Sequence, residues 1–245
     1  MNSVFVAYTR ALRSLMRPDI FWHLLWPSLL AFAIWIGVAV FFWADASAAL
    51  IHMADGWPLV GNWFAHEESG RVTVAVVVNV LLFMLAVPLV FVTSAILVSI
   101  FALPMMLERV ARTDYSDLEE RRGGTITGSL FNSLWALVVF LVVAGLTLPF
   151  WLIPGVGLVL SVLLSAWLNQ RCYRYDALMN HADKAELRDV PRRRKGGVYA
   201  LGIGAGVLAF VPFLNLFVPA FTGLAFVHYL LEGLRRDRRL TARAA

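Results

Sequence analysis

Four polar residues near the N-terminus have the spacing of one helical face. Arg10, Arg13, Ser14 and Arg17 recur at i, i+3, i+4 and i+7, opposite an apolar face of a predicted helix over residues 3–17. Guanidinium groups donate paired hydrogen bonds to the oxygens of carboxylates and phosphates. The pattern therefore predicts a helix lying in the membrane interface with its arginines on anionic lipid headgroups.

Two breaks in long apolar stretches offer a second kind of anion ligand. The N-terminus of a half-helix presents unpaired N–H groups and the positive end of the helix dipole. Repeated interrupted hydrophobic segments are also typical of transport sites. The candidate groups at the two breaks are Gly155, Gly157 and Asn215. Ordinary proline and glycine turns would produce the same pattern, so both interpretations stay open.

These breaks divide two uncharged stretches into hairpins. Gly123 to Gln170 carries no charged residue and is long enough for two helical arms, whose charged ends must emerge on one side. Gly196 to Leu231 repeats the plan with arms of roughly 14 and 12 residues, each only ~18–21 Å long. Because a full crossing needs ~30 Å, we expect the second hairpin to enter the bilayer only partway.

Composition and charge placement indicate an integral membrane protein. Hydrophobic residues make up 60% of the chain, charged residues 15%, and the mean hydropathy is +0.73. Of the 21 Lys and Arg residues, all but Arg71 fall in segments that a simple threading places on one face. The positive-inside rule then predicts that both termini and both hairpin bases are cytoplasmic. The apolar run from Ile20 to Ala44 is 25 residues, longer than the ~7–15 of a signal peptide core, so we expect it to remain as a span.

We expect an all-α protein with two long transmembrane helices, two Pro-broken helical hairpins and amphipathic interfacial helices. The predicted elements form one membrane domain over 1–245: an amphipathic helix at 3–17, a first span at 20–44, a long second helix at 72–112, a first hairpin at 126–169, an interfacial helix at 170–187, a second hairpin at 198–231 and a basic tail at 232–245. Gly202 and Gly206 have the GxxxG spacing of a helix-packing face rather than a dinucleotide-binding fingerprint.

The sequence lacks the usual signatures of catalysis. It contains no G-x-S-x-G, H-E-x-x-H or P-loop motif, no Cys/His metal spacing, and no charge deep in an apolar run. We therefore expect no enzyme activity, metal or cofactor, and we disfavour a membrane enzyme acting on lipid. The basic run from Arg192 to Lys195 is interpreted as a topology signal in contact with lipid headgroups, not as a nucleic-acid site.

Four short motifs in matching order resemble one family. They are Ala11-Leu-Arg13 with Arg17-Pro18, Leu103-Pro-Met-Met-Leu-Glu108, the stretch from Ala166-Trp167 through Arg171-Cys-Tyr-Arg-Tyr-Asp176 to His181-Ala182, and Val211-Pro-Phe-Leu-Asn-Leu-Phe-Val-Pro-Ala220. The chain is similar in these to the CysZ-type sulfate permeases, part of the wider etoposide-induced-type family. It departs at Ala11, where the family has glycine, and a methyl group there could limit backbone approach.

The resemblance implies a bacterial inner-membrane permease or channel that admits sulfate toward cysteine synthesis without ATP hydrolysis. By position it implies Arg13 as the sulfate ligand with Arg10 beside it, and Glu108 in a conducting network. To these we add Arg109 and Asn215. One arginine under-compensates a dianion, so we expect a homo-oligomer or several half-helix ends around the path, with sulfate or a related oxyanion and membrane lipids as partners. The alternative is a non-transporting membrane protein that acts through protein or lipid contacts.

Overall fold

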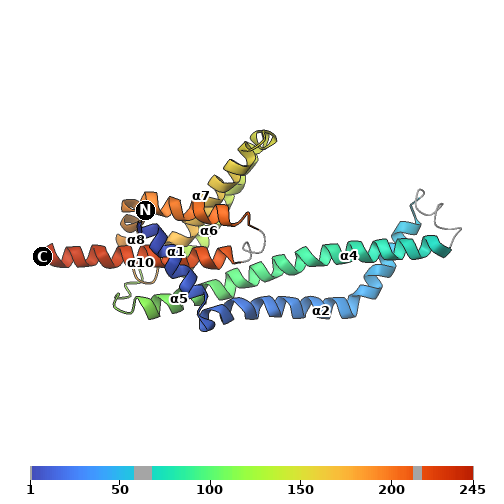
Figure 1. Ribbon diagram of the computed structural model, residues 1–245, viewed down its shortest axis with the longest axis horizontal. Helices are drawn as coiled ribbons and strands as arrows, with labels where there is room; N and C mark the ends of the chain where they lie inside the picture. Colours follow the sequence, from blue (N-terminus) through green and yellow to red (C-terminus); the bar gives the residue numbers. More distant parts are fainter. Residues whose placement is uncertain (1, 58–67, 212–216, 245) are drawn as a thin grey trace. The chain divides into compact units, whose positions relative to one another are not determined.

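The computed structural model describes residues 2–57, 68–211 and 217–244, and this part of the chain is helical without strands. Its elements, as labelled in Figure 1, are α1 Asn2–Leu15, α2 Pro18–Asp55, α4 Glu68–Leu97, the π-helical η1 Val98–Ala102, α5 Leu103–Asp114, α6 Ile126–Thr147, the 3₁₀-helical η2 Leu148–Leu152, α7 Val156–Leu178, α8 Glu186–Arg193, α9 Lys195–Leu208 and α10 Val218–Ala244. Their contacts divide the chain into two compact units, residues 1–24 with 102–245 and residues 25–101.

Among the described residues, three helical stretches are long and apolar enough to cross a membrane. They are Pro18–Asp55, Ser69–Asp114 and Ile126–Leu152. Large apolar side chains on them point outward, with Phe41 and Leu152 77% and 87% exposed, and such a surface is stable only against lipid or other protein. The prediction of an all-α, multi-pass membrane protein is confirmed.

The unit of residues 25–101 contains two apolar helices joined by polar side chains. The indole of Trp43 on α2 donates to the Asn79 side-chain oxygen on α4 at 2.7 Å, and the Asn79 amide donates to Ser47 at 3.2 Å. Trp35 donates to Thr93 at 3.1 Å. Because an unpaired polar group is costly in hydrocarbon, these bonds fix the pairing of α2 and α4.

In the other unit, α10 is the helix around which the core forms. It contacts α1, α5, α7, α8 and α9, and α1 lies across it in Figure 1. Its side chains Leu224, Phe226 and Leu230 are fully buried, as expected for a helix covered on several faces. The sequence beyond residue 231, predicted as a basic tail, continues this helix to Ala244.

Helices α7 and α9 meet through glycine. A Cβ atom on Gly202 would lie 2.6 Å from the Ala166 carbonyl oxygen, and one on Gly206 would lie 3.1 Å from that of Val162. The two glycines and their two partners are each four residues apart, so one face of α9 rests on the backbone of α7. The predicted GxxxG packing face is confirmed.

Ion pairs hold the end of α10 on α8, and acid should weaken them. Arg238 lies 2.8 Å from Glu186, and this hydrogen bond holds the pKa of the Glu186 carboxyl below its usual value despite partial burial. The stabilisation is therefore present above the unfolded pKa, near 4.5, and is lost as pH falls through the folded one. We expect acidification to lower the free energy of unfolding by about 1 kcal/mol less in Arg238→Gln than in wild type. Thermal unfolding in detergent at several pH values measures this difference. Equal pH profiles of the two proteins would contradict this expectation.

Candidate anion-binding site

A cationic cavity of about 520 Å³ lies among α1, α10 and the end of α5. We call it the α1 cavity. Its lining residues are Arg10, Arg13, Ser14, Arg17, Asp114, Tyr115, His228 and Arg235. Four guanidinium groups therefore face the same space as a single carboxylate, a balance that favours an anion.

The small residues of α1 determine which of its side chains reach this cavity. Ala7 and Ala11 are buried against the rest of the unit, where α1 packs on α10. Because the Ala7 and Ala11 side chains are only methyl groups, α1 and α10 approach closely there, and Arg10 and Arg13 remain outside this contact and line the cavity. The Ala11 methyl is fully buried and is absent from the cavity lining, so it does not narrow the space.

A buried hydrogen-bonded triad closes one side of the α1 cavity. The Ser14 hydroxyl lies 2.9 Å from Nε2 of His228, and the Tyr115 hydroxyl lies 3.0 Å from its Nδ1. The Tyr115 hydroxyl also donates to the His228 carbonyl oxygen at 3.1 Å. Burial raises the pKa of Tyr115 to about 12, so its phenol keeps its proton. These bonds satisfy both ring nitrogens and give the cavity a rigid wall.

Arg13 differs from the other arginines of the α1 cavity in its partners. Arg17 lies 3.2 Å from Asp114, and Arg235 is paired with Asp117 and lies 4.6 Å from the centre of the Tyr115 ring. Within the described ranges, the Arg13 side chain has no hydrogen-bond or ion-pair partner. Its five N–H donors are therefore available to a ligand in the cavity.

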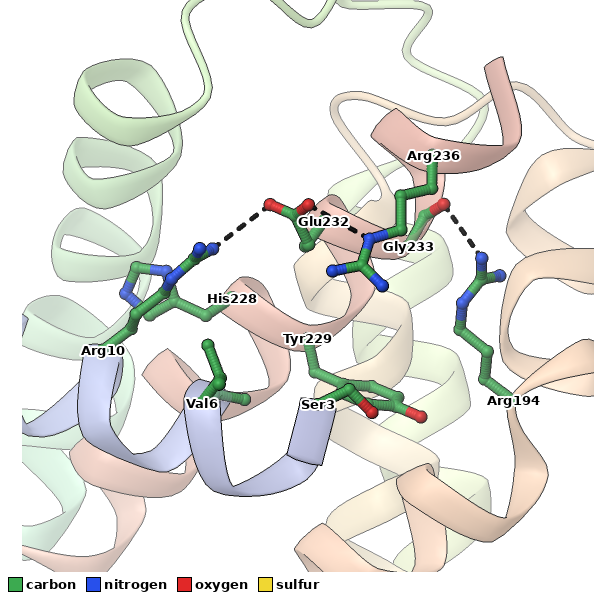
Figure 2. A pocket seen from close by; sticks show the side chains of 10 residues that line it. Ser3, Val6, Arg10, Arg194, His228, Tyr229, Glu232, Gly233 and Arg236 are labelled. Atoms are coloured by element: carbon green, nitrogen blue, oxygen red, sulfur yellow. Dashed lines mark hydrogen bonds and ion pairs between the residues drawn. The ribbon is translucent and has the colours of Figure 1, made fainter. Parts of the chain in front are cut away.

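Arg10 belongs to two cavities at once. Besides the α1 cavity, it lines a second one of about 370 Å³ together with Arg194, Glu232 and Arg236. Figure 2 shows Arg10 on α1 directed at Glu232 on α10, with Arg236 on the other carboxylate oxygen. The Arg10–Glu232 distance is 3.1 Å. Burial opposes ionisation of Glu232, but the hydrogen bonds from Arg10 and Arg236 outweigh it and lower its pKa.

The candidate residues on α5 lie outside the α1 cavity. Glu108 is exposed and pairs with Arg112 at 2.6 Å, one helical turn away. Arg109 donates to Asp19 at 3.0 Å, and Asp19 in turn lies 3.5 Å from Arg17, which lines the cavity. The structure thus connects Arg109 to the cavity through one carboxylate, whereas Glu108 has no such connection within the described residues.

The glycine candidates lie apart from this arginine cluster. Gly155 has a φ of +81° and precedes the first turn of α7, a conformation that favours glycine. Gly157 lies in that first turn, close to the backbone of Trp151. Neither glycine lines the α1 cavity, and Asn215 lies outside the described residues.

Four lining residues had not been singled out from the sequence. Asp114 and Tyr115 follow a predicted helix end, His228 lies within the last apolar arm, and Arg235 follows that arm. Their role depends on contacts with residues more than 90 positions away, which no local pattern reports. In the described part of the chain, no three His, Cys, Asp or Glu side chains gather into a possible metal site.

Fold and site together define a multi-pass α-helical membrane protein that contains a cationic cavity. A family model described as Sulfate transporter CysZ/Etoposide-induced protein 2.4 matches residues 7–219. The chain therefore belongs to this family, and membership supports a membrane sulfate transporter at family level. No curated protein and no solved structure matches it.

Proposed function

We propose that the protein is a permease or channel for sulfate or a similar small oxyanion, with Arg13 as the principal ligand. The observation that carries this proposal is an unpaired guanidinium in a cavity with four arginines and one aspartate. Sulfate is a strongly hydrated dianion, so a protein path must replace its water with donors. A guanidinium does so with two parallel hydrogen bonds.

The same proposal includes the setting of transport. The protein lies in a bacterial inner membrane with both termini cytoplasmic, and it takes up sulfate toward cysteine synthesis without ATP hydrolysis. Charge placement and family membership support these statements. A single unpaired arginine leaves a dianion under-compensated, so a homo-oligomer that brings several such cavities to one path is part of the proposal.

Radiolabelled sulfate uptake into proteoliposomes without ATP tests the proposal. We expect uptake above that of empty vesicles, with competition by other tetrahedral dianions. Uptake equal to that of empty vesicles would reject transport. It would favour the alternative of a membrane protein that acts through protein or lipid contacts. The exposed apolar side chains of Phe5 and Leu12 on α1, and of Met16 just after it, would make such contacts.

Glu232→Gln should tighten sulfate binding. Glu232 holds Arg10 and Arg236 by charge-assisted hydrogen bonds, so its neutralisation releases guanidinium donors toward an entering anion. We expect the half-saturating sulfate concentration for uptake to fall about threefold or more. Glu119→Gln is the matched control, because it removes one exposed carboxylate that pairs with Arg121 and lines neither cavity. Equal effects of the two substitutions would contradict a specific role of Glu232.

A further inference from the structure

A separate cavity of about 650 Å³ lies where α6, α7 and α8 meet. We call it the α8 cavity. Four cationic side chains line it, Arg174 of α7 with Lys184, Arg188 and Arg192 of the α8 region, and its lining contains no carboxylate. The side chains of Tyr175, Leu187 and Pro191 form a less polar part of the cavity wall.

The spacing of three of these cations makes their charges adjacent. Lys184, Arg188 and Arg192 follow at intervals of four residues, which places them along one side of α8 and the turn before it. Like charges at this spacing destabilise a helix. Their repulsion is relieved if an anion binds between them.

Two acidic residues near the α8 cavity, Asp183 and Glu186, are engaged elsewhere. Asp183 accepts from the backbone N–H groups of Ala185 and Glu186 at 2.8 Å, and Glu186 pairs with Arg238 at 2.8 Å. Among the described residues, Lys184, Arg188 and Arg192 have no side-chain hydrogen bond or ion pair. Arg174 has a single 3.5 Å hydrogen bond to the neutral Gln170.

The surroundings of Arg174 also disfavour an uncompensated charge. Burial lowers the pKa of its guanidinium, and the neighbouring charge of Arg171 lowers it further. In addition, Nε of Arg171 is buried without a hydrogen-bond partner. This end of α7 therefore holds more positive charge than its protein surroundings balance.

A cavity on the other side of α8 shows that this imbalance is local. That cavity is lined by Arg121, Arg193 and Arg238 together with Glu186, Asp189 and Asp237, so its charges balance. Arg192 and Arg193 are adjacent in sequence and both exposed, yet they line different cavities. Non-specific attraction of anions would depend equally on Arg192 and Arg193, whereas binding of a ligand in the α8 cavity would depend on Arg192 alone.

We propose that the α8 cavity binds a phosphate-type tetrahedral oxyanion, either free in solution or carried by a lipid headgroup. Arginine and lysine donors bind such an anion from several sides. The less polar wall suits the glycerol portion of a headgroup. This site shares no residue with the α1 cavity, so it does not depend on the proposed transport function.

Thermal unfolding and native mass spectrometry of the detergent-purified protein test this site. The probes are sodium phosphate, sodium chloride at equal ionic strength, short-chain phosphatidylglycerol and short-chain phosphatidylcholine. We expect saturable stabilisation by phosphate or by phosphatidylglycerol, and none by the other two. A response to phosphate identifies a free-anion site, and a response to phosphatidylglycerol alone identifies a headgroup site. No saturable response to either would overturn the proposal.

Neighbouring arginines provide the matched variants. Arg188→Gln and Arg192→Gln should each weaken the response about tenfold, whereas Arg193→Gln should change it less than twofold. Arg188→Gln should also raise the unfolding temperature of the ligand-free protein, since it removes like-charge repulsion. Equal losses in Arg192→Gln and Arg193→Gln would overturn the proposal. So would a response that disappears in Arg13→Ala, because the anion would then occupy the α1 cavity.

Discussion

Arg13→Ala should reduce sulfate uptake into proteoliposomes about 10- to 100-fold. The substitution removes a bidentate, charge-assisted donor, and each hydrogen bond to a charged group contributes about 1.5–3 kcal/mol. Arg13 is the expected centre of this loss because Arg10, Arg17 and Arg235 of the α1 cavity already pair with carboxylates. The measurement is the initial uptake rate over a range of sulfate concentrations.

Arg13→Lys separates anion binding from anchoring to the membrane. Lysine keeps the positive charge that attracts headgroups but lacks the planar fork that grips a tetrahedral oxyanion. We therefore expect it to reconstitute like wild type and to transport at a clearly reduced rate. Arg243→Ala, which removes an exposed arginine far along α10, is the net-charge control for Arg13→Ala. Full uptake by Arg13→Lys would mean that charge alone suffices at this position.

Gly202→Ala should lower the free energy of unfolding by about 2–3 kcal/mol. The added methyl would meet the Ala166 carbonyl oxygen at 2.6 Å, and neither backbone can yield as a side-chain end would. The helices α7 and α9 must therefore separate, which disturbs a main contact of the core. Thermal unfolding in detergent measures the change.

Gly196→Ala on the same helix is the matched control. A Cβ there meets nothing within 4 Å, so the substitution should be neutral or should stabilise by up to about 1 kcal/mol through helix propensity. If the two alanine variants unfold alike, the close contact at Gly202 does not limit stability. If both are destabilised, helix α9 tolerates alanine poorly for another reason.

Much of the fold follows from local sequence patterns. Apolar run length predicts membrane helices, and four-residue glycine spacing predicts the face that α9 presents to α7. The period of Arg10, Arg13 and Ser14 also identifies the polar side of α1. These features depend on residues within a few turns of one another, so they can be read without knowing the tertiary contacts.

The remainder of the site depends on pairing between distant residues. The sequence has 16 acidic and 21 basic residues, and no local rule assigns Glu232 to Arg10 or Asp114 to Arg17. The end of α10 was predicted as a tail because its composition is polar. In the structure, Arg194 donates to Asp237 of this segment, and Arg238 of this segment donates to Glu186 on α8. Tertiary contacts, rather than propensity, make that segment part of the core unit.

The packing of α1 against α10 also has a consequence for the order in which the protein is made. Arg10 and Glu232 are 222 positions apart, and Ser14 and His228 are 214 apart. At a synthesis rate of roughly 5–20 residues per second, α1 waits about 10–45 s for its partner helix to be translated. The α1 cavity therefore cannot be complete while the earlier spans are being inserted, and Arg10 and Ser14 lack their α10 partners until that helix has been made.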